Sequence, residues 1–539
     1  MRMTFFVLIF FQLIVNNKSF AQQEQLIYHP IQTDTNGNII PWYNADPGTS
    51  YDHIIRIVWN FWDTMRHDMN GLPYYMNHQV WNPNFDDPRG MGGDQLAMAL
   101  SSWRLLYAYT GNERVKENMC FIAGYYLTHG LSPSNAKWPD IPFPYNTLVY
   151  SGIFDGDMKA GKDVTQPDKA GSFGLELVHI YKIKEDEVYL DAAVKIANTL
   201  ASHVTKGDLD HSPLPFKVNA FTGKTALLRH HDFTGGAIDS AGYTSNWAPT
   251  MQLFLDLIEL KKGNVTAYKK SFDLLLAWMK KYPLPNNKWG PFFEDVDWWS
   301  DTQINAMTFA RFIMEHPAYF PKWNEQVRNI IEWVHKNFAN DKWKKYGVVV
   351  TNEQTVYQTP GESHTSRQGA DELLYVSLTH DSTFYINAIR QLSWATYSVD
   401  FDGKNCFPQD EPWLTDGYGD YVRHFLRAMA ADPQLTADED HILSSTSVIQ
   451  QSDYKGNLKK FLVPDFDKVD TNKVTLFYRA YGVTGVEILK LKNKPSRVLL
   501  NNKPIEETSS AEGYSWKPLL RGGVLTIQRN KGKNVIIME

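Results

Sequence analysis

Apolar residues recur at intervals of three and four along most of the chain, which is typical of helices that bury one face. This spacing predicts helices over the ranges 52–66, 93–110, 113–129, 172–183, 187–203, 246–261, 267–281, 302–315, 324–340, 367–378, 382–399 and 420–431. Short turns at 109–112, 184–186, 262–264 and 379–381 separate helices that we expect to run antiparallel. The pattern therefore predicts a mainly α fold, an α/α toroid of about six helical hairpins. An open α-solenoid is the alternative.

The pattern changes near residue 446. Short apolar-rich runs follow at 473–479, 486–491, 496–500, 523–527 and 534–537, with turn residues between them. They predict a C-terminal antiparallel β-sandwich, which we place at 446–539, after a toroid catalytic domain at 22–445. Because residues 446–539 include few clustered acids or histidines, we expect this domain to have a structural role and the catalytic residues to lie in the toroid.

The first residues have the features of a secretory signal peptide. Arg2 precedes an apolar run from Phe5 to Val15, and polar residues then lead to Ser19-Phe20-Ala21, with small residues at the expected cleavage positions. We expect residues 1–21 to be removed by cleavage after Ala21, and the protein to be periplasmic or secreted. No later stretch is apolar for long enough to span a membrane. In that oxidising compartment Cys120 and Cys406 could form a disulfide or remain as two buried thiols.

Composition narrows the class of ligand. Aromatic residues make up 14% of the chain, enough to fill helix interfaces and leave some for stacking on sugar rings. The net charge is -6 and there is no long basic run, so nothing indicates nucleic acid as a partner. An anionic oligosaccharide or polysaccharide would have to be met by local positive charge.

The long polar connections between hairpins carry the candidate chemistry, and in a toroid they gather at one mouth. They span 75–92, 132–171, 207–245, 283–301, 347–366 and 403–419. Reactive side chains are dense in and beside them at 229–233 with 243–247, at 361–367, at 413–427 and at 289–299, and less so at 89–95.

We consider three kinds of site for these side chains: a metal site, a glycoside hydrolase site and a site for β-elimination. His230, His231, His364 and His424 show no metal-ligand spacing, so we predict no metal and no cofactor. A glycoside hydrolase needs two facing carboxyl groups. Candidates for them are Glu294, Asp295, Asp297, Glu362, Asp416 and Asp420.

The third chemistry is β-elimination on a uronic acid. A base removes the C5 proton while a cation or hydrogen-bond donor neutralises the carboxylate, because that proton is otherwise too weakly acidic. A tyrosinate or a neutral imidazole can serve as the base. Suitable groups are Tyr243 with His231 and Asn246, and Tyr418 with His364 and Arg367. In the competing structural interpretation, Arg367 only pairs with Glu362.

Two stretches, together with the expected domain arrangement, suggest a family. They are 361–367 (Gly-Glu-Ser-His-Thr-Ser-Arg) and 415–424 (Thr-Asp-Gly-Tyr-Gly-Asp-Tyr-Val-Arg-His). The chain resembles the uronate-active enzymes of marine Bacteroidetes polysaccharide utilisation, in particular the oligosaccharide dehydratases of ulvan degradation. The resemblance implies removal of water across C4–C5 of a non-reducing-end glucuronyl residue. An endo-acting polysaccharide lyase would use the same chemistry with a glycosidic leaving group.

These considerations assign roles to named residues. Tyr243 or Tyr418 is the expected base, and His231 or His364 the acid or second base. Arg367 and Asn246 are expected to neutralise the carboxylate. The expected contacts to sugar or sulfate are Arg89, Asp94, Trp247, Glu362 and Arg423.

Overall fold

The computed structural model describes residues 24–76, 93–148, 151–157, 159–229, 238–293, 299–406, 418–455, 469–508 and 512–539, with the backbone alone at 93–95, 228, 229, 238–240 and 418. The expected signal peptide lies outside the described residues. The helices are α1 Pro47–Asp63, α2 Gly93–Thr110, α3 Glu113–His129, α4 Pro167–Lys184, α5 Glu187–His203, α6 Ala248–Leu260, α7 Val265–Lys281, α8 Pro283–Asn286, α9 Gln303–Glu315, α10 Trp323–Phe338, α11 Glu362–Thr379, α12 Tyr385–Thr396 and α13 Tyr418–Ala431.

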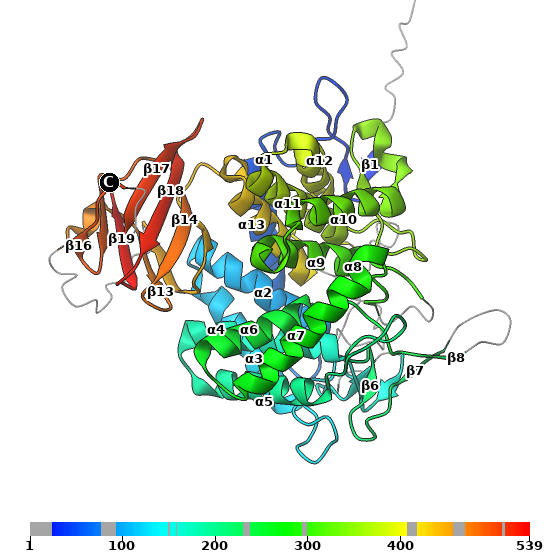
Figure 1. The fold of residues 1–539 in the computed structure, drawn as a ribbon. Helices are drawn as coiled ribbons and strands as arrows, with labels where there is room; N and C mark the ends of the chain where they lie inside the picture. The colour runs from blue at the N-terminus through cyan, green and yellow to red at the C-terminus, as the bar shows by residue number, and fades with distance from the viewer. Residues whose placement is uncertain are drawn as a thin grey trace, which may run out of the picture.

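These helices form two concentric layers (Figure 1). Within the described part of the chain, the six helices α2, α4, α6, α9, α11 and α13 contact one another in that order, and α13 returns to α2. The outer helices α3, α5, α7, α10 and α12 each pack on the inner helix next to them in sequence, and α1 packs on α13. The ring is closed, so the predicted α/α toroid is confirmed and the open solenoid is excluded.

Local sequence explains the short turns. Asn112, Asp186 and Asn264 each accept a hydrogen bond from a backbone N–H in the first turn of the following outer helix, which caps it. Three inner helices, α4, α6 and α11, end on Glu185, Lys261 and His380 in left-handed conformation. These three helices therefore stop, and the chain reverses, within a few residues.

Two glycines allow the inner helices to approach closely. A Cβ on Gly171 of α4 would lie 1.9 Å from Oγ1 of Thr250 on α6. A Cβ on Gly419 of α13 would lie 2.8 Å from Cβ of Ala99 on α2. Larger side chains at these positions would force the ring apart.

The predicted starts of two inner helices were wrong, as was that of the outer helix expected from residue 52, which begins at Pro47. The helix expected from residue 172 begins at Pro167, and the helix expected from residue 367 begins at Glu362. Both segments are polar, so their apolar periodicity is weak, although each lies on an inner helix. The stretch 361–367 is therefore the first turns of α11 and not a loop.

Short two-stranded ribbons lie in the connections: β1 Gln25–Leu26, β2 His29–Pro30, β3 Gly156–Asp157, β4 Gly161–Lys162, β5 Val164–Thr165, β6 Val218–Asn219, β7 Leu227–Arg229, β8 Ile238–Ser240, β9 Ala339–Asn340 and β10 Val350–Thr351. The C-terminal strands are β11 His441–Ser445, β12 Ile449–Tyr454, β13 Val474–Ala480, β14 Gly485–Leu491, β15 Arg497–Leu500, β16 Lys503–Pro504, β17 Gly513–Pro518, β18 Gly523–Arg529 and β19 Asn534–Met538.

The C-terminal strands form two antiparallel sheets, in the orders β11-β14-β18-β17 and β12-β13-β19-β15-β16 (Figure 1). Alternate residues such as Leu476 and Tyr478 of β13 point into the core between the sheets, whereas Phe477 belongs to a separate cluster. The predicted β-sandwich is confirmed. Its first strand begins at His441, slightly before the change of pattern in the sequence.

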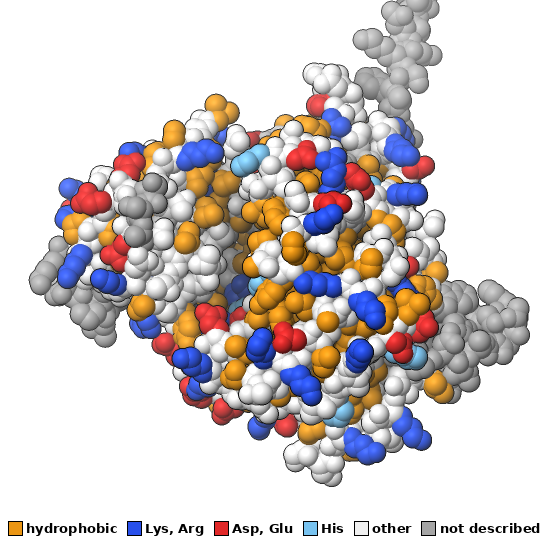
Figure 2. Space-filling view, viewed as in Figure 1, with side chains coloured by type: hydrophobic (Ala, Val, Ile, Leu, Met, Phe, Trp, Pro, Cys, Tyr) orange, Lys and Arg blue, Asp and Glu red, His pale blue; other side chains and the backbone are white. Residues whose placement is uncertain are grey.

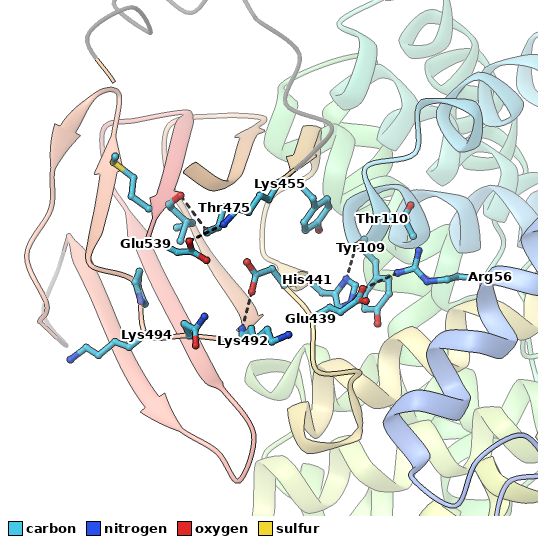
Figure 3. Close-up of a pocket in the computed structure, with 16 residues that line it drawn as sticks. Arg56, Tyr109, Thr110, Glu439, His441, Lys455, Thr475, Lys492, Lys494 and Glu539 are labelled. Atoms are coloured by element: carbon cyan, nitrogen blue, oxygen red, sulfur yellow. Dashed lines mark hydrogen bonds and ion pairs between the residues drawn. The ribbon is translucent and has the colours of Figure 1, made fainter. Parts of the chain in front are cut away.

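The two domains meet where α2 ends (Figure 3). The imidazole of His441 stacks on Tyr109 with 3.7 Å between ring centroids, and Tyr454 donates its hydroxyl proton to the carbonyl of Ala108 at 2.6 Å. A cleft of about 530 Å³ lies at this junction, and two of its lysines pair with acids, Lys455 with Glu539 and Lys494 with Glu507, each at 2.8 Å. The sandwich is thus anchored to the end of the ring at which α2 stops.

Two further findings concern the whole chain. Cys120 and Cys406 do not form a disulfide with each other. Among the helices of the described residues, none combines the length and the apolar character needed to cross a bilayer.

Candidate active site

The long connections lead from outer to inner helices, so they gather where the inner helices begin. The candidate residues of α11 and α13 lie at this end, in the first turns of each helix. In the described part of the chain, the opposite end carries the short turns and the sandwich. We refer to the two as the mouth end and the short-turn end.

A buried ionic cluster joins α11 to α13 at the mouth end. The carboxylate of Asp420 accepts hydrogen bonds from Nη2 of Arg367 at 2.5 Å and from the hydroxyl of Ser363, and it pairs with the guanidinium of Arg423. Nε2 of His424 lies 3.2 Å away. Arg367 and Asp420 are each only 2% exposed. Two guanidiniums thus share one carboxylate, and the cluster has a net positive charge.

Electrostatics hold this carboxylate ionised. Burial by itself would raise the pKa of Asp420, but the charges of Arg423 and Arg367 lower that pKa well below its ordinary value. Burial also lowers the pKa of Arg367, to about 10, which leaves it charged at neutral pH. The predicted alternative pairing of Arg367 with Glu362 does not occur, because Glu362 accepts a hydrogen bond from Asn405 at 3.0 Å.

His364 is the candidate base whose surroundings the structure describes best. It lies in the first turn of α11, 7% exposed, with its ring 5.6 Å from that of Phe293. Burial, and then the positive charge of Arg367, lowers the pKa of His364 to about 3. The imidazole is therefore neutral at neutral pH, which is the form that can accept a proton.

A second polar group lies across the ring, where α4 and α6 begin. Asn246 donates its side-chain amide proton to Asp168 at 2.9 Å, and Nζ of Lys169 lies 3.1 Å from the same carboxylate. The ammonium of Lys169 also lies 3.0 Å from the centre of the Phe292 ring. Asn246, Lys169 and Arg367 line one cavity of about 720 Å³ inside the ring, together with Arg423.

Three predicted site residues are packed in the interior and do not line this cavity. Tyr243 donates its hydroxyl proton to the carbonyl of Lys288 at 2.5 Å, and burial, then Asp301 and Asp210, raises its pKa above the ordinary value, which argues against a base. Trp247 is fully buried at 0% exposure and offers no face to a sugar. Glu362 is 2% exposed and is held by Asn405.

Other predicted residues cannot be placed in the site. His231 and Arg89 lie outside the described residues, as do Glu294, Asp295, Asp297 and Asp416. For Tyr418 and Asp94 the backbone is described, at the starts of α13 and α2, but not the side chains. In the described ranges, no group of three His, Cys, Asp or Glu residues is arranged to hold a metal ion.

The sequence analysis missed several cavity residues: Arg104, Lys169, Arg311, Asp371 and Arg427. A signal for some of them was present. Arg367 and Asp371 are four residues apart, as are Arg423 and Arg427, so each pair lies on one face of its helix. Charged pairs on the face that should be apolar indicate a lined cavity rather than a packed core.

Comparison with known proteins supports the fold. The sequence matches no family model and no curated protein. The structure is similar to cellobiose 2-epimerase from Bacillus thermoamylovorans B4167 (TM-score 0.52, 14% identity, covering 70% of this chain and 98% of that one). It is also similar to cellobiose 2-epimerase from Spirochaeta thermophila DSM 6192 (0.51, 13%, 71% and 97%) and to a sugar epimerase from a ruminal bacterium (0.52, 12%, 70% and 98%). At these identities the likeness shows the α/α toroid and nothing finer.

Proposed function

We propose that this protein is a carbon–oxygen lyase that acts by β-elimination on glucuronate-containing oligosaccharides. In the form we favour, it is a dehydratase that removes water across C4–C5 of a non-reducing-end glucuronyl residue, as in ulvan degradation. The observation that carries the proposal is a neutral, buried imidazole, His364, one helical turn before a buried Arg367 whose cluster has excess positive charge.

The chemistry requires this combination. The electron pair left when the C5 proton departs is delocalised onto the carboxylate, so a cation or amide must neutralise it. His364 would take the proton, and the excess charge shared by Arg367 and Arg423 would face the carboxylate, with Asn246 lining the same cavity. The C4 hydroxyl leaves as water after accepting a proton, for which Tyr418 and His231 remain the proposed donors.

The structure favours His364 over Tyr243 as the base. The Tyr243 hydroxyl is already used in a hydrogen bond to a backbone carbonyl, and the acids near it oppose ionisation. Burial and the Arg367 charge keep the His364 imidazole in the unprotonated form that can accept a proton, and the same lowering of its pKa makes it a weaker base. Tyr418 remains a second candidate for the base.

The first experiment is incubation with glucuronyl-rhamnose oligosaccharides, followed by mass spectrometry and ultraviolet absorbance. Loss of one water with unchanged chain length and new absorbance of an unsaturated uronate would support a dehydratase. Shortened products with the absorbance would mean a lyase, and shortened products without it a hydrolase. An unchanged mass with a new sugar isomer would indicate an epimerase, which also begins by removing a proton next to a carbonyl.

Two variants sharpen the result. His364→Gln should abolish product formation while the thermal unfolding curve stays close to that of the wild type. His380→Asn is the matched control, since His380 is exposed at the short-turn end and has the left-handed conformation that Asn tolerates. Full activity in His364→Gln would remove His364 from the mechanism.

A further inference from the structure

The cavity inside the ring continues beyond the candidate active site. From Asn246 and Arg367 it extends to His316, just after the last residue of α9, and to Thr446 of the C-terminal domain. Figure 2 shows a hollow between the sandwich and the helical domain, with basic and histidine side chains at its floor. The short-turn end of the ring is therefore open to a ligand beside the sandwich.

Most cations in this part of the cavity have a carboxylate partner. Nε of Arg104 lies 3.2 Å from Glu176. Arg311 pairs with Asp371 at 2.5 Å and with Glu315 at 3.3 Å. These pairs account for the acids that line the cavity.

Arg427 is the exception. It lines the cavity from α13, and no residue in the described ranges forms a hydrogen bond or ion pair with its guanidinium. Burial, then the charges of Arg311 and Arg423, lowers its pKa to about 9, so it is still charged at neutral pH. Glu315 and Asp371 attract Arg427 without forming an ion pair with it, because both pair with Arg311, so an anion placed beside Arg427 would lower the cost of burying its charge.

The rest of the lining suits a sugar rather than an ion alone. Phe312 and Leu175 contribute apolar surface, while Gln252 and Thr308 contribute hydrogen-bonding groups. The whole cavity, with a volume of about 720 Å³, is within the range of small-molecule sites and extends from the candidate active site to this end. Sugars combine apolar C–H faces with hydroxyl groups and would be complementary to such walls.

We propose that the short-turn end of this cavity is a second binding site, for a saccharide unit carrying a sulfate or carboxylate group, with Arg427 binding the anionic group. Arg427 lies one helical turn beyond Arg423 on α13, about 6 Å along the helix axis, and nine residues beyond Tyr418, about 13 Å. The site therefore lies deeper in the same cavity than the first turns of α11 and α13, and it does not depend on the proposed elimination. A bound anionic sugar here would contact the inner helices and the start of the sandwich together.

The test is calorimetric titration of the full-length protein at pH 7.5 and constant ionic strength. The probes are rhamnose 3-sulfate, sodium glucuronate, neutral rhamnose and sodium sulfate, so that the sulfate and carboxylate sources are separated. Arg427→Gln should weaken binding of the favoured anionic sugar at least about tenfold, because a charge-assisted hydrogen bond is lost. Arg328→Gln is the matched control, since Arg328 is an arginine on the outer helix α10.

Arg427→Gln should also fold well, since no ion pair is broken. We expect the ligand-free variant to unfold close to the temperature of the wild type, because the lost repulsion with Arg311 and Arg423 is offset by the lost attraction of Glu315 and Asp371. Equal affinity of wild type and Arg427→Gln for both anionic sugars, or no binding of either by the wild type, would overturn the proposal. Equally tight binding of inorganic sulfate and rhamnose 3-sulfate would overturn its saccharide part. Because binding and not turnover is measured, these outcomes are independent of whether elimination occurs.

Discussion

The ionic cluster around Asp420 makes a quantitative prediction about stability. Asp420→Asn keeps the size of the side chain and removes the charge that Arg367 and Arg423 share. Two buried guanidiniums would then lack a counter-ion, which costs about 3–5 kcal/mol. For a domain of roughly 400 residues with an unfolding entropy of about 2 cal/mol/K per residue, this lowers Tm by about 4–6 °C.

The assay is thermal unfolding followed by circular dichroism and calorimetry. Asp381→Asn is the matched control, because Asp381 pairs with Arg328 at 2.7 Å on the surface, where screening by water makes the pair weak. Asn at that position can still cap the turn. We expect the control to unfold within about 1 °C of the wild type.

The pH dependence provides an independent check. The pKa of Asp420 is lowered in the folded protein, so its contribution to stability is fully present above the unfolded-state value of about 4. The contribution is lost as pH falls below that value towards the folded pKa. The Tm difference between wild type and Asp420→Asn should therefore be constant from pH 8 to pH 5 and shrink below about pH 4. An Asp420→Asn variant as stable as the control would refute the account of the cluster.

Three further outcomes follow from single side chains. The lowered pKa of His364 keeps its imidazole neutral well below pH 5. Protonation of this residue should therefore not lower kcat/KM between pH 8 and pH 5. A loss of rate that titrates with an ordinary histidine pKa and disappears in His364→Gln would contradict this. Tyr243→Phe should retain turnover and lose about 1 kcal/mol of stability with the hydrogen bond to Lys288, and an inactive but folded variant would restore Tyr243 as a base. Gly171→Ala should lower Tm by the equivalent of about 1–3 kcal/mol, since its Cβ would clash with Thr250, and an unchanged Tm would show that α4 and α6 can move apart.

Local patterns in the sequence determined the elements. The bounds predicted for α2, α3 and α5 are those of the structure, because three- and four-residue periodicity and capping by Asn112 and Asp186 act within a few residues. The change of pattern near residue 446 likewise marked the sandwich. The closed ring followed from repeated hairpins joined by short turns.

Only the tertiary structure decided what each side chain contacts. Arg367 could have paired with Glu362 on the same helix, yet its partner is Asp420 on the neighbouring α13. Tyr243 and Trp247 were predicted as site residues, but in the folded protein both are buried; the Tyr243 hydroxyl, for example, donates to the carbonyl of Lys288. Arg427 is chemically equivalent to other arginines in the sequence, and only the packing of the inner helices left it without a partner. Periodicity specifies which face of a helix turns inward, whereas the partners on that face come from helices distant in the chain.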